Sequence, residues 1–178
     1  MESMAINWQP GNLANDIVRL APLDESDFER IFEVAADPLI WEQHPTKNRY
    51  EKEVFQLYFD GALASKTAFL IINSRSGKII GCTRYYDAKP GNSSIAIGYT
   101  FLSRACWGGL HNRACKKLLL DYAFQFVDKV YFHVGATNLR SQLATRKIGA
   151  KKIGEVSFDH YGENQVHYEY LIQKQEWK

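Results

Sequence analysis

The chain has 178 residues, 46% of them apolar, and a formal net charge of +2 at pH 7. This length predicts one domain over residues 1–178, and the apolar fraction is sufficient for a full hydrophobic core. The small net charge gives no reason to expect a nucleic acid or a membrane as partner, and no segment has the pattern of a signal peptide or a membrane span. Cys82, Cys106 and Cys115 show no metal-binding or redox spacing. We therefore expect a reduced, soluble, cytoplasmic protein.

The first third of the chain predicts one strand and two helices. Residues 1–16 have the composition of a polar, loop-like leader, and residues 17–20 that of a strand. Apolar residues at helical spacing predict helices over residues 24–36 and 51–64. Between these helices, residues 39–50 are more aromatic than an ordinary exposed loop. This segment therefore has either a structural or a binding role.

The middle of the chain predicts a β-meander followed by a helix. Period-two alternation predicts strands over residues 68–72, 78–86 and 94–102, joined by turn sequences and therefore antiparallel. A helix follows over residues 112–126, and a crossover then leads to a strand over residues 130–134, parallel to the strand at 94–102. The helix has a buried apolar stripe, whereas its opposite, exposed face carries Arg113, Lys116, Lys117, Asp121 and Gln125.

The last part of the chain predicts a short helix and a hairpin. The helix covers residues 138–148 and ends at Gly149, a common C-terminal cap. Strands over residues 152–158 and 166–172 form the hairpin, with a turn at residues 162–164. The expected fold class is thus α/β (α+β), with a mixed, mostly antiparallel sheet of about six or seven strands and helices on both faces.

The junction between residues 94–102 and the following helix has the features of an anion site. Gly108 and Gly109 let the backbone bend and leave its amides uncovered by side chains. The free amides of the first helical turn and the helix dipole both favour a bound anion at this turn. The simpler alternative is an ordinary glycine turn with no ligand.

Two stretches resemble the GCN5-related N-acetyltransferase (GNAT) family, and the branch they resemble is that of the ribosomal-protein N-terminal acetyltransferases. Residues 99–102 (Tyr-Thr-Phe-Leu) and 107–112 (Trp-Gly-Gly-Leu-His-Asn) resemble the strand and pyrophosphate loop of the family's acetyl-CoA site. Residues 138–141 (Asn-Leu-Arg-Ser), with Gly149 further on, resemble its second cofactor motif. The order of elements agrees from about residue 17 to residue 172.

The resemblance implies direct acetyl transfer from acetyl-CoA to a primary amine, either a protein N-terminus or a small molecule. It also implies backbone amides near Thr100 and Leu102 that polarise the thioester, and Ser141 as the hydrogen-bond donor to the departing thiolate. We expect the protein to be a monomer or a homodimer. The cofactor-binding residues that it implies are Thr100, Phe101, Leu102, Trp107, Gly108, Gly109, Leu110, His111, Asn112, Arg113, Asn138 and Ser141.

The sequence departs from the family pattern at several positions. Leu110 replaces a glycine of the loop, and Ala96 and Ala114 stand where the family often carries glutamates. Thr145 takes the place of a tyrosine that acts as an acid elsewhere in the family, so it competes with Ser141 for that role. The departures keep two alternatives open: a non-catalytic acyl-CoA sensor and an interaction domain without CoA.

The base that deprotonates the acceptor amine is expected in the aromatic segment 39–50. Glu42 and His44 are the candidates, acting directly or through a water, and the segment is expected to line the acceptor side of the cleft. Surface positions for both residues, and simple core packing for the neighbouring aromatic side chains, are the alternatives. Asn138 can likewise act as a helix N-cap. Because the histidines show no metal-binding spacing, no metal is expected.

Overall fold

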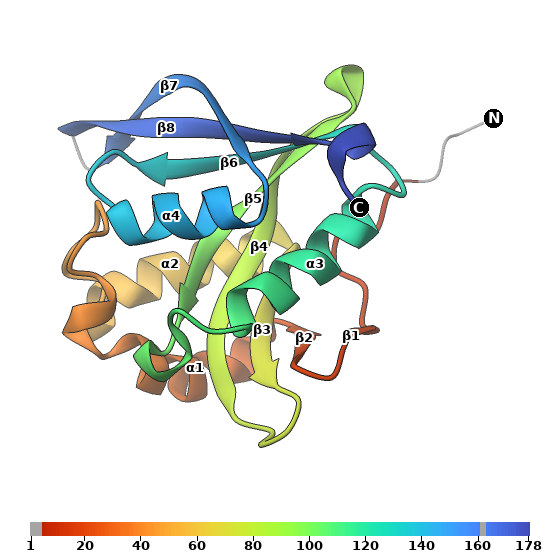
Figure 1. Cartoon of the computed structure of the whole chain (residues 1–178). Helices are drawn as coiled ribbons and strands as arrows, with labels where there is room; N and C mark the ends of the chain where they lie inside the picture. Colours follow the sequence, from red (N-terminus) through yellow and green to blue (C-terminus); the bar gives the residue numbers. More distant parts are fainter. Residues whose placement is uncertain (1–4, 161–162) are drawn as a thin grey trace.

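The computed structural model describes residues 5–160 and 163–178. Within these ranges eight strands form one sheet in the order β1-β2-β3-β4-β5-β6-β8-β7 (Figure 1). Only β5 and β6 pair in parallel, so the predicted mixed, mostly antiparallel sheet is confirmed, with one strand more than the expected six or seven. The strands are β1 (Leu13–Ala14), β2 (Val18–Pro22), β3 (Ala68–Asn73), β4 (Ile79–Lys89), β5 (Ser94–Leu102), β6 (Lys129–Gly135), β7 (Lys151–His160) and β8 (Glu163–Gln173).

Helices cover both faces of the sheet, as predicted. The helices are α1 (Phe28–Ala35), α2 (Lys52–Ser65), α3 (His111–Ala123) and α4 (Leu139–Lys147). In Figure 1 α3 and α4 lie in front of the sheet, and α1 and α2 lie behind it. Each face has its own core, because successive side chains of a strand alternate between the faces. In β3, Phe69 and Ile71 join the core under α3, and Leu70 joins the core under α1 and α2.

The N-terminal leader differs from the predicted loop. Leu13 and Ala14 pair with β2 as the extra edge strand. Trp8 packs on Tyr85 of β4 and on Tyr122 of α3, with ring centroids 5.0 and 6.2 Å apart. The described part of the leader is thus held to the sheet by contacts with residues far along the chain, which local sequence patterns do not reveal.

The feature that creates the site is the separation of β5 from β6. Their parallel pairing covers only the residues from Ser94↔Lys129 to Ala96↔Tyr131. Beyond Ala96, β5 continues along β4 to the pair Leu102↔Gly81, with a shift of register on the way. Tyr99 lies in this irregular stretch with a positive φ of 52°. A β-bulge of this kind bends a strand, and here β5 turns away from β6.

The remaining differences are local. Helix α3 ends at Ala123, three residues before the expected end, and Gly149 follows α4 with the positive φ of 98° that suits a C-terminal glycine. Of the predicted turn at residues 162–164, residue 162 lies outside the described residues, and residues 163 and 164 belong to β8. Among the described helices, none has the length and apolar character that a bilayer crossing requires.

Candidate active site

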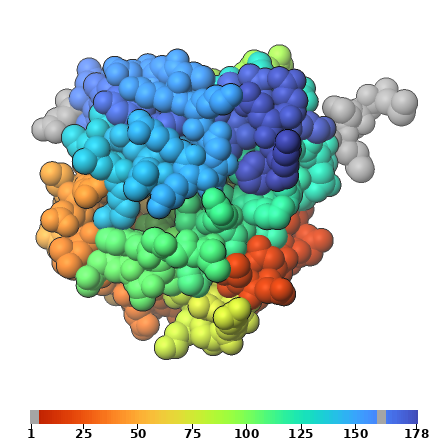
Figure 2. Space-filling view, viewed as in Figure 1, coloured from red at the N-terminus to blue at the C-terminus, as the bar shows by residue number. Residues whose placement is uncertain are grey.

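A cavity of about 210 Å³ occupies the gap between β5 and β6. Its walls come from residues 97–102 of β5, residues 132–135 of β6, helix α4, the loop before α3 and residues 40–45. Figure 2 shows the same face of the molecule hollowed between the blue atoms of α4 and the green atoms of the loop before α3. Segments distant in sequence therefore meet at one opening.

The structure brings most of the predicted site residues to this cavity. Its lining includes Thr100, Phe101, Leu102, Trp107, Gly108, Asn112, Asn138, Ser141 and, from the predicted acceptor side, His44. Outside the lining are Gly109, Leu110, His111 and Arg113, which belong to the turn and first helical residues beside the cavity. Glu42 is exposed and is also absent from the lining.

The N-terminus of α3 presents uncapped amides next to the cavity. Leu110, at the N-cap position, makes no side-chain hydrogen bond to the first turn, and the Ala114 amide is the donor to the Leu110 carbonyl. The three amides before Ala114 therefore have no partner within the helix. Gly108 has a positive φ of 69°, which a glycine adopts without strain. The Leu110 side chain is 63% exposed, so it leaves the turn open.

Lys116 is a site residue that the sequence pattern placed wrongly on the exposed face of its helix. Its side chain is buried and lines the cavity. Lys116 Nζ donates hydrogen bonds to Thr100 Oγ1 at 3.0 Å and to Asn112 Oδ1 at 3.3 Å. Burial lowers the pKa of this ammonium group. No carboxylate forms an ion pair with it among the described residues, so the cavity contains a cation with only neutral partners.

Helix α4 supplies a polar group on the opposite wall. Asn138 is the N-cap, and its Oδ1 accepts a hydrogen bond of 3.3 Å from the Ser141 amide, which confirms the capping alternative. The Thr145 hydroxyl donates to the Ser141 carbonyl at 2.7 Å. The proton of the Thr145 hydroxyl is therefore already used inside the helix, whereas no hydrogen bond of the Ser141 hydroxyl is seen within the described residues.

The aromatic segment forms part of a core and part of the cavity wall. Trp41 is buried, donates from Nε1 to the Ala35 carbonyl at 2.8 Å and packs on Phe101 with ring centroids 5.1 Å apart. His44 lines the cavity, but its Nδ1 accepts a hydrogen bond of 2.9 Å from the Thr46 amide. The Nδ1 lone pair of His44 is thus occupied.

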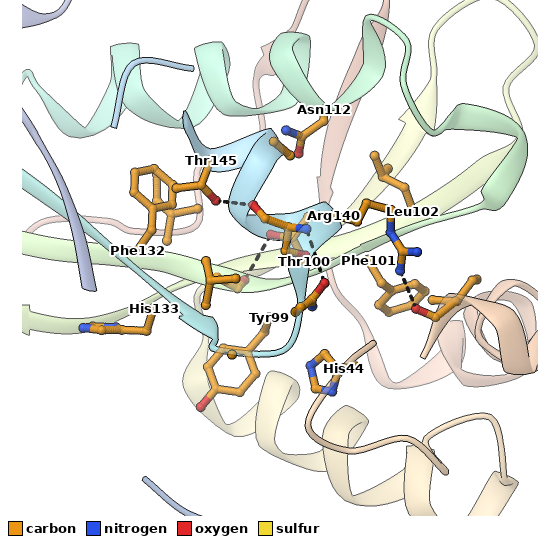
Figure 3. Close-up of a pocket in the computed structure, with 18 of the residues that line it drawn as sticks. His44, Tyr99, Thr100, Phe101, Leu102, Asn112, Phe132, His133, Arg140 and Thr145 are labelled. Atoms are coloured by element: carbon orange, nitrogen blue, oxygen red, sulfur yellow. Dashed lines mark hydrogen bonds between the residues drawn. The ribbon is translucent and has the colours of Figure 1, made fainter. Parts of the chain in front are cut away.

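Arg140 holds three walls of the cavity together, a role without a signal in the sequence pattern. Its guanidinium carbon lies 3.5 Å from the centroid of the Trp107 ring, and its Nη2 donates to the Ile40 carbonyl at 3.0 Å. Its backbone amide donates to Gln43 Oε1 at 3.1 Å. Figure 3 shows Arg140 projecting from α4 between Thr100 and Leu102, with Thr145 and Asn112 on one side of the cavity and Tyr99, His133 and His44 toward the other.

Neither a metal centre nor an activated cysteine is formed by the described residues. No group of three His, Cys, Asp or Glu side chains in residues 5–160 and 163–178 could hold a metal ion. Cys82, Cys106 and Cys115 are all buried and unbridged. Burial raises the pKa of Cys106, the one cysteine in the cavity wall, and raises that of Cys82 and Cys115 to about 11. These thiols are poor nucleophiles near neutral pH.

Solved structures that share this fold include several acetyltransferases. A GCN5-related N-acetyltransferase from Brucella melitensis superposes with a TM-score of 0.80 at 19% identity, over 96% of this chain and 85% of that one. Spermidine N-acetyltransferase from Vibrio cholerae, in complex with CoA and spermine, gives a TM-score of 0.69 at 16% identity, over 91% and 98%. Mycobacterium smegmatis RimJ, in complex with CoA-disulfide, gives 0.67 at 18% identity, over 89% and 83%. The fold is therefore that of the acetyltransferases.

The sequence comparison is more specific. The profile described as the acetyltransferase (GNAT) domain matches residues 18–151, which is most of the chain. The chain belongs to the GNAT acetyltransferase family. No curated protein sequence matches it.

Proposed function

We propose that the protein transfers an acetyl group from acetyl-CoA directly to a primary amine, as one acetyltransferase domain spanning residues 1–178. The observation that carries this proposal is the cavity between β5 and β6, which runs from the uncapped N-terminus of α3 to Asn138 and Ser141. We infer that it acts in the cytoplasm, as a monomer or as a homodimer.

The residues present fit acetyl-CoA in both size and charge. The cavity of about 210 Å³ is smaller than the roughly 300–1,000 Å³ of pockets that enclose a drug-sized ligand, so it can hold the acyl end and part of the pantetheine arm only. The phosphates then lie outside, where the amides before Ala114 and the dipole of α3 favour an anion. Lys116 adds a positive charge in the adjoining wall. Asn138 and residues 100–102 provide hydrogen-bonding groups for the arm.

Acyl transfer needs a polarised carbonyl and a stabilised thiolate. In this proposal backbone amides of β5 near Thr100 and Leu102 donate to the thioester oxygen as charge develops on it. The Ser141 hydroxyl donates a hydrogen bond to the departing sulfur. The transfer is direct, because the raised pKa of Cys106 disfavours an acyl-cysteine intermediate. The thioester supplies an activated acyl group, and the protein supplies orientation and these donors.

The acceptor is a primary amine of a protein N-terminus or of a small molecule. The Asn-x-x-Ser sequence at residues 138–141 and Trp107 support the ribosomal-protein N-terminal acetyltransferase branch. The polyamine acceptor is supported by the fold shared with the Vibrio enzyme that is complexed with spermine. His44 and Glu42 are the initial candidates for the base; His44 lines the cavity and Glu42 is exposed beside it.

A non-catalytic acyl-CoA sensor is the second candidate. Ala96 and Ala114 stand where related enzymes often carry glutamates; both are buried, and Ala114 belongs to the core under α3. A carboxylate is therefore missing at two positions where family members use one. A sensor would bind acetyl-CoA without consuming it.

Two measurements test the proposal in sequence. Thermal and urea unfolding with acetyl-CoA at 100 times its Kd should show about 2.7 kcal/mol of added stability. Thiol release from acetyl-CoA is then measured with a panel of amines: a peptide with a free N-terminus, spermine, an amino sugar and an aminoglycoside. Release that depends on one class of amine supports the transferase. Binding without release on every amine identifies the sensor, and no binding overturns both.

A further inference from the structure

A chain of hydrogen bonds links three strands at the edge of the cavity. Tyr86 Oη on β4 lies 2.6 Å from His133 Nδ1 on β6, and His133 Nε2 lies 2.8 Å from Glu169 Oε2 on β8. Both distances are within the range of good hydrogen bonds. His133 lines the cavity, whereas Tyr86 lies beside Gly98 of the lining without being part of it. None of these three residues was a candidate site residue from the sequence.

The hydrogen-bond chain depends on the register of the sheet and on a glycine in β5. Glu169 is the register partner of His133 in the antiparallel β6–β8 pair, which places their side chains side by side. Tyr86 and His133 are on strands that have β5 between them. The Tyr86 ring crosses β5 at Gly98, where an added Cβ would lie 2.8 Å from Tyr86 Cε1. A glycine is therefore required at this point of β5 if Tyr86 is to reach His133.

The protonation pattern follows from the surroundings. Burial raises the pKa of Tyr86, so its hydroxyl keeps its proton and donates it to His133 Nδ1. With Nδ1 accepting from Tyr86, the ring proton of His133 is on Nε2 and is donated to the Glu169 carboxylate. Tyr99, whose ring packs on that of Tyr86, and Asp87 also raise the pKa of Tyr86, whereas Arg84 lowers it. On the other side, the ring of Phe158 packs on those of His133 and His167.

The hydrogen-bond chain of Tyr86, His133 and Glu169 lies where the acceptor amine is expected to bind. In Figure 3 His133 and Tyr99 lie away from Asn112 and Thr145, the residues of the cofactor half. Glu169 has 27% of its side chain exposed, so one end of the chain reaches solvent, whereas His133 has only 10% exposed. By contrast, His44 Nδ1 is occupied by the Thr46 amide and Glu42 is exposed outside the lining.

We propose that Tyr86 and His133, supported by Glu169, form the relay that takes up the proton lost by the acceptor amine. The proposal rests on the amine acetylation proposed above. Tyr86 is not among the residues that line the cavity, so the proton reaches it through a water: the ammonium N–H bond breaks as a bond to the water oxygen forms, and an O–H bond of that water breaks as a bond to hydrogen forms at Tyr86 Oη. The Tyr86 O–H bond breaks as an N–H bond forms at His133 Nδ1. The Nε2–H bond stays intact, and Glu169 stabilises the imidazolium, which afterwards releases its proton to solvent.

The kinetic test uses three variants and two matched controls on the most reactive amine of the panel. His133→Asn should lower kcat/KM by about 10²-fold or more and remove the acid limb of its pH profile, because the imidazole that takes up the proton is gone. Tyr86→Phe and Glu169→Gln should lower kcat/KM less, with acetyl-CoA affinity unchanged in all three. Tyr131→Phe, on the same face of β6, and Glu155→Gln, exposed on β7, should behave like the wild type. An unchanged acid limb in folded His133→Asn would overturn the relay.

A second measurement is independent of the acceptor. The chain has five histidines, so the imidazole nitrogens can be assigned by ¹⁵N NMR. The wild type should show His133 with Nε2 protonated and Nδ1 unprotonated, and Tyr86→Phe should change the Nδ1 signal. A His133 protonated on Nδ1 would contradict the relay even in an active enzyme. If the wild type acetylates no amine while NMR shows the expected tautomer, the proposed function fails and the hydrogen-bond chain alone remains.

Discussion

Lys116 Nζ of α3 donates a hydrogen bond of 3.0 Å to Thr100 Oγ1 of β5, in the stretch where β5 has left β6. The Thr100 hydroxyl is also 2.8 Å from that of Thr83 on β4. A buried ammonium is costly unless it is paired with an anion. The described residues offer Lys116 hydroxyl and amide oxygens only, so a ligand with negative charge would improve its surroundings.

The Lys116→Met variant should bind CoA about tenfold more weakly, because a buried positive charge beside the cavity is lost while the volume is nearly kept. Calorimetric titration with CoA measures the change. Lys117→Met is the matched control, since Lys117 is exposed and pairs with Asp121 at 2.8 Å. Equal affinities for the Lys116 variant and the wild type would show that this charge does not act on the ligand.

Lys116 should also make stability depend on pH. Folding lowers the pKa of Lys116 from its ordinary value of 10.5. Between the lowered pKa of the folded state and 10.5, the unfolded chain binds more protons than the folded one, so the free energy of unfolding rises with pH. Cys82 and Cys115, with pKa values raised to about 11, have the opposite effect when the unfolded cysteines ionise first. The wild type and Lys116→Met both contain Cys82 and Cys115, so the contribution of the two cysteines cancels when their stabilities are subtracted. The difference in urea stability, wild type minus Lys116→Met, should therefore increase from pH 7 toward pH 10.5.

Phosphate binding at the turn before α3 can be tested by introducing one negative charge. Gly109→Asp should weaken CoA binding by about tenfold or more, because a carboxylate beside the amides repels a bound phosphate. The fold should survive, since a Cβ at Gly109 would meet no atom closer than His111 Nδ1 at 3.8 Å. Gly109→Ala controls for the side chain alone and should bind CoA nearly as the wild type does. Full affinity in a folded Gly109→Asp protein would show that the phosphates do not bind at this turn.

The burial of Lys116 shows where prediction from this sequence ends. Strand and helix periods were sufficient for the mixed sheet, the parallel β5–β6 pair and helices on both faces, because these depend on local alternation and on chain connectivity. The helical period also separates the buried Leu119 from the exposed Lys117. It cannot show that the Lys116 position faces the gap left by β5, which depends on a bulge near Tyr99 with no sequence signature.

The same limit applies to His133. Its neighbours Tyr86 and Glu169 are 47 and 36 residues away in sequence, and neither spacing belongs to a known motif. The contacts arise from the strand order and from Gly98, which looks like an ordinary strand glycine in the sequence. Asn138 and Gly108 could be found because their roles depend on the chain just beside them, a helix start and a tight turn.

The Ser141 hydroxyl and the Thr145 hydroxyl can be separated by one pair of variants. Ser141→Ala should lower kcat by about 10²-fold or less, because a thiolate is a good leaving group and needs little assistance. Thr145→Val should change kcat little, since the Thr145 hydroxyl already donates to the Ser141 carbonyl. CoA affinity serves as the control and should stay constant in both. The opposite pattern would transfer the role to Thr145, and two silent variants would mean that the thiolate leaves unaided.

The aromatic segment gives the last prediction, because its two polar candidates are placed differently. His44 lines the cavity and is held by the Thr46 amide, so His44→Ala should raise the acceptor KM by loosening this wall while leaving CoA affinity unchanged. Glu42 is exposed outside the lining, and Glu42→Ala should keep nearly full activity. A base would instead show a large loss of kcat with an altered pH profile. Steady-state kinetics from pH 6 to 9 on both variants distinguish the outcomes. If His44→Ala abolishes the acid limb that His133→Asn leaves intact, then the base is in the aromatic segment, and β6 only supports the wall opposite.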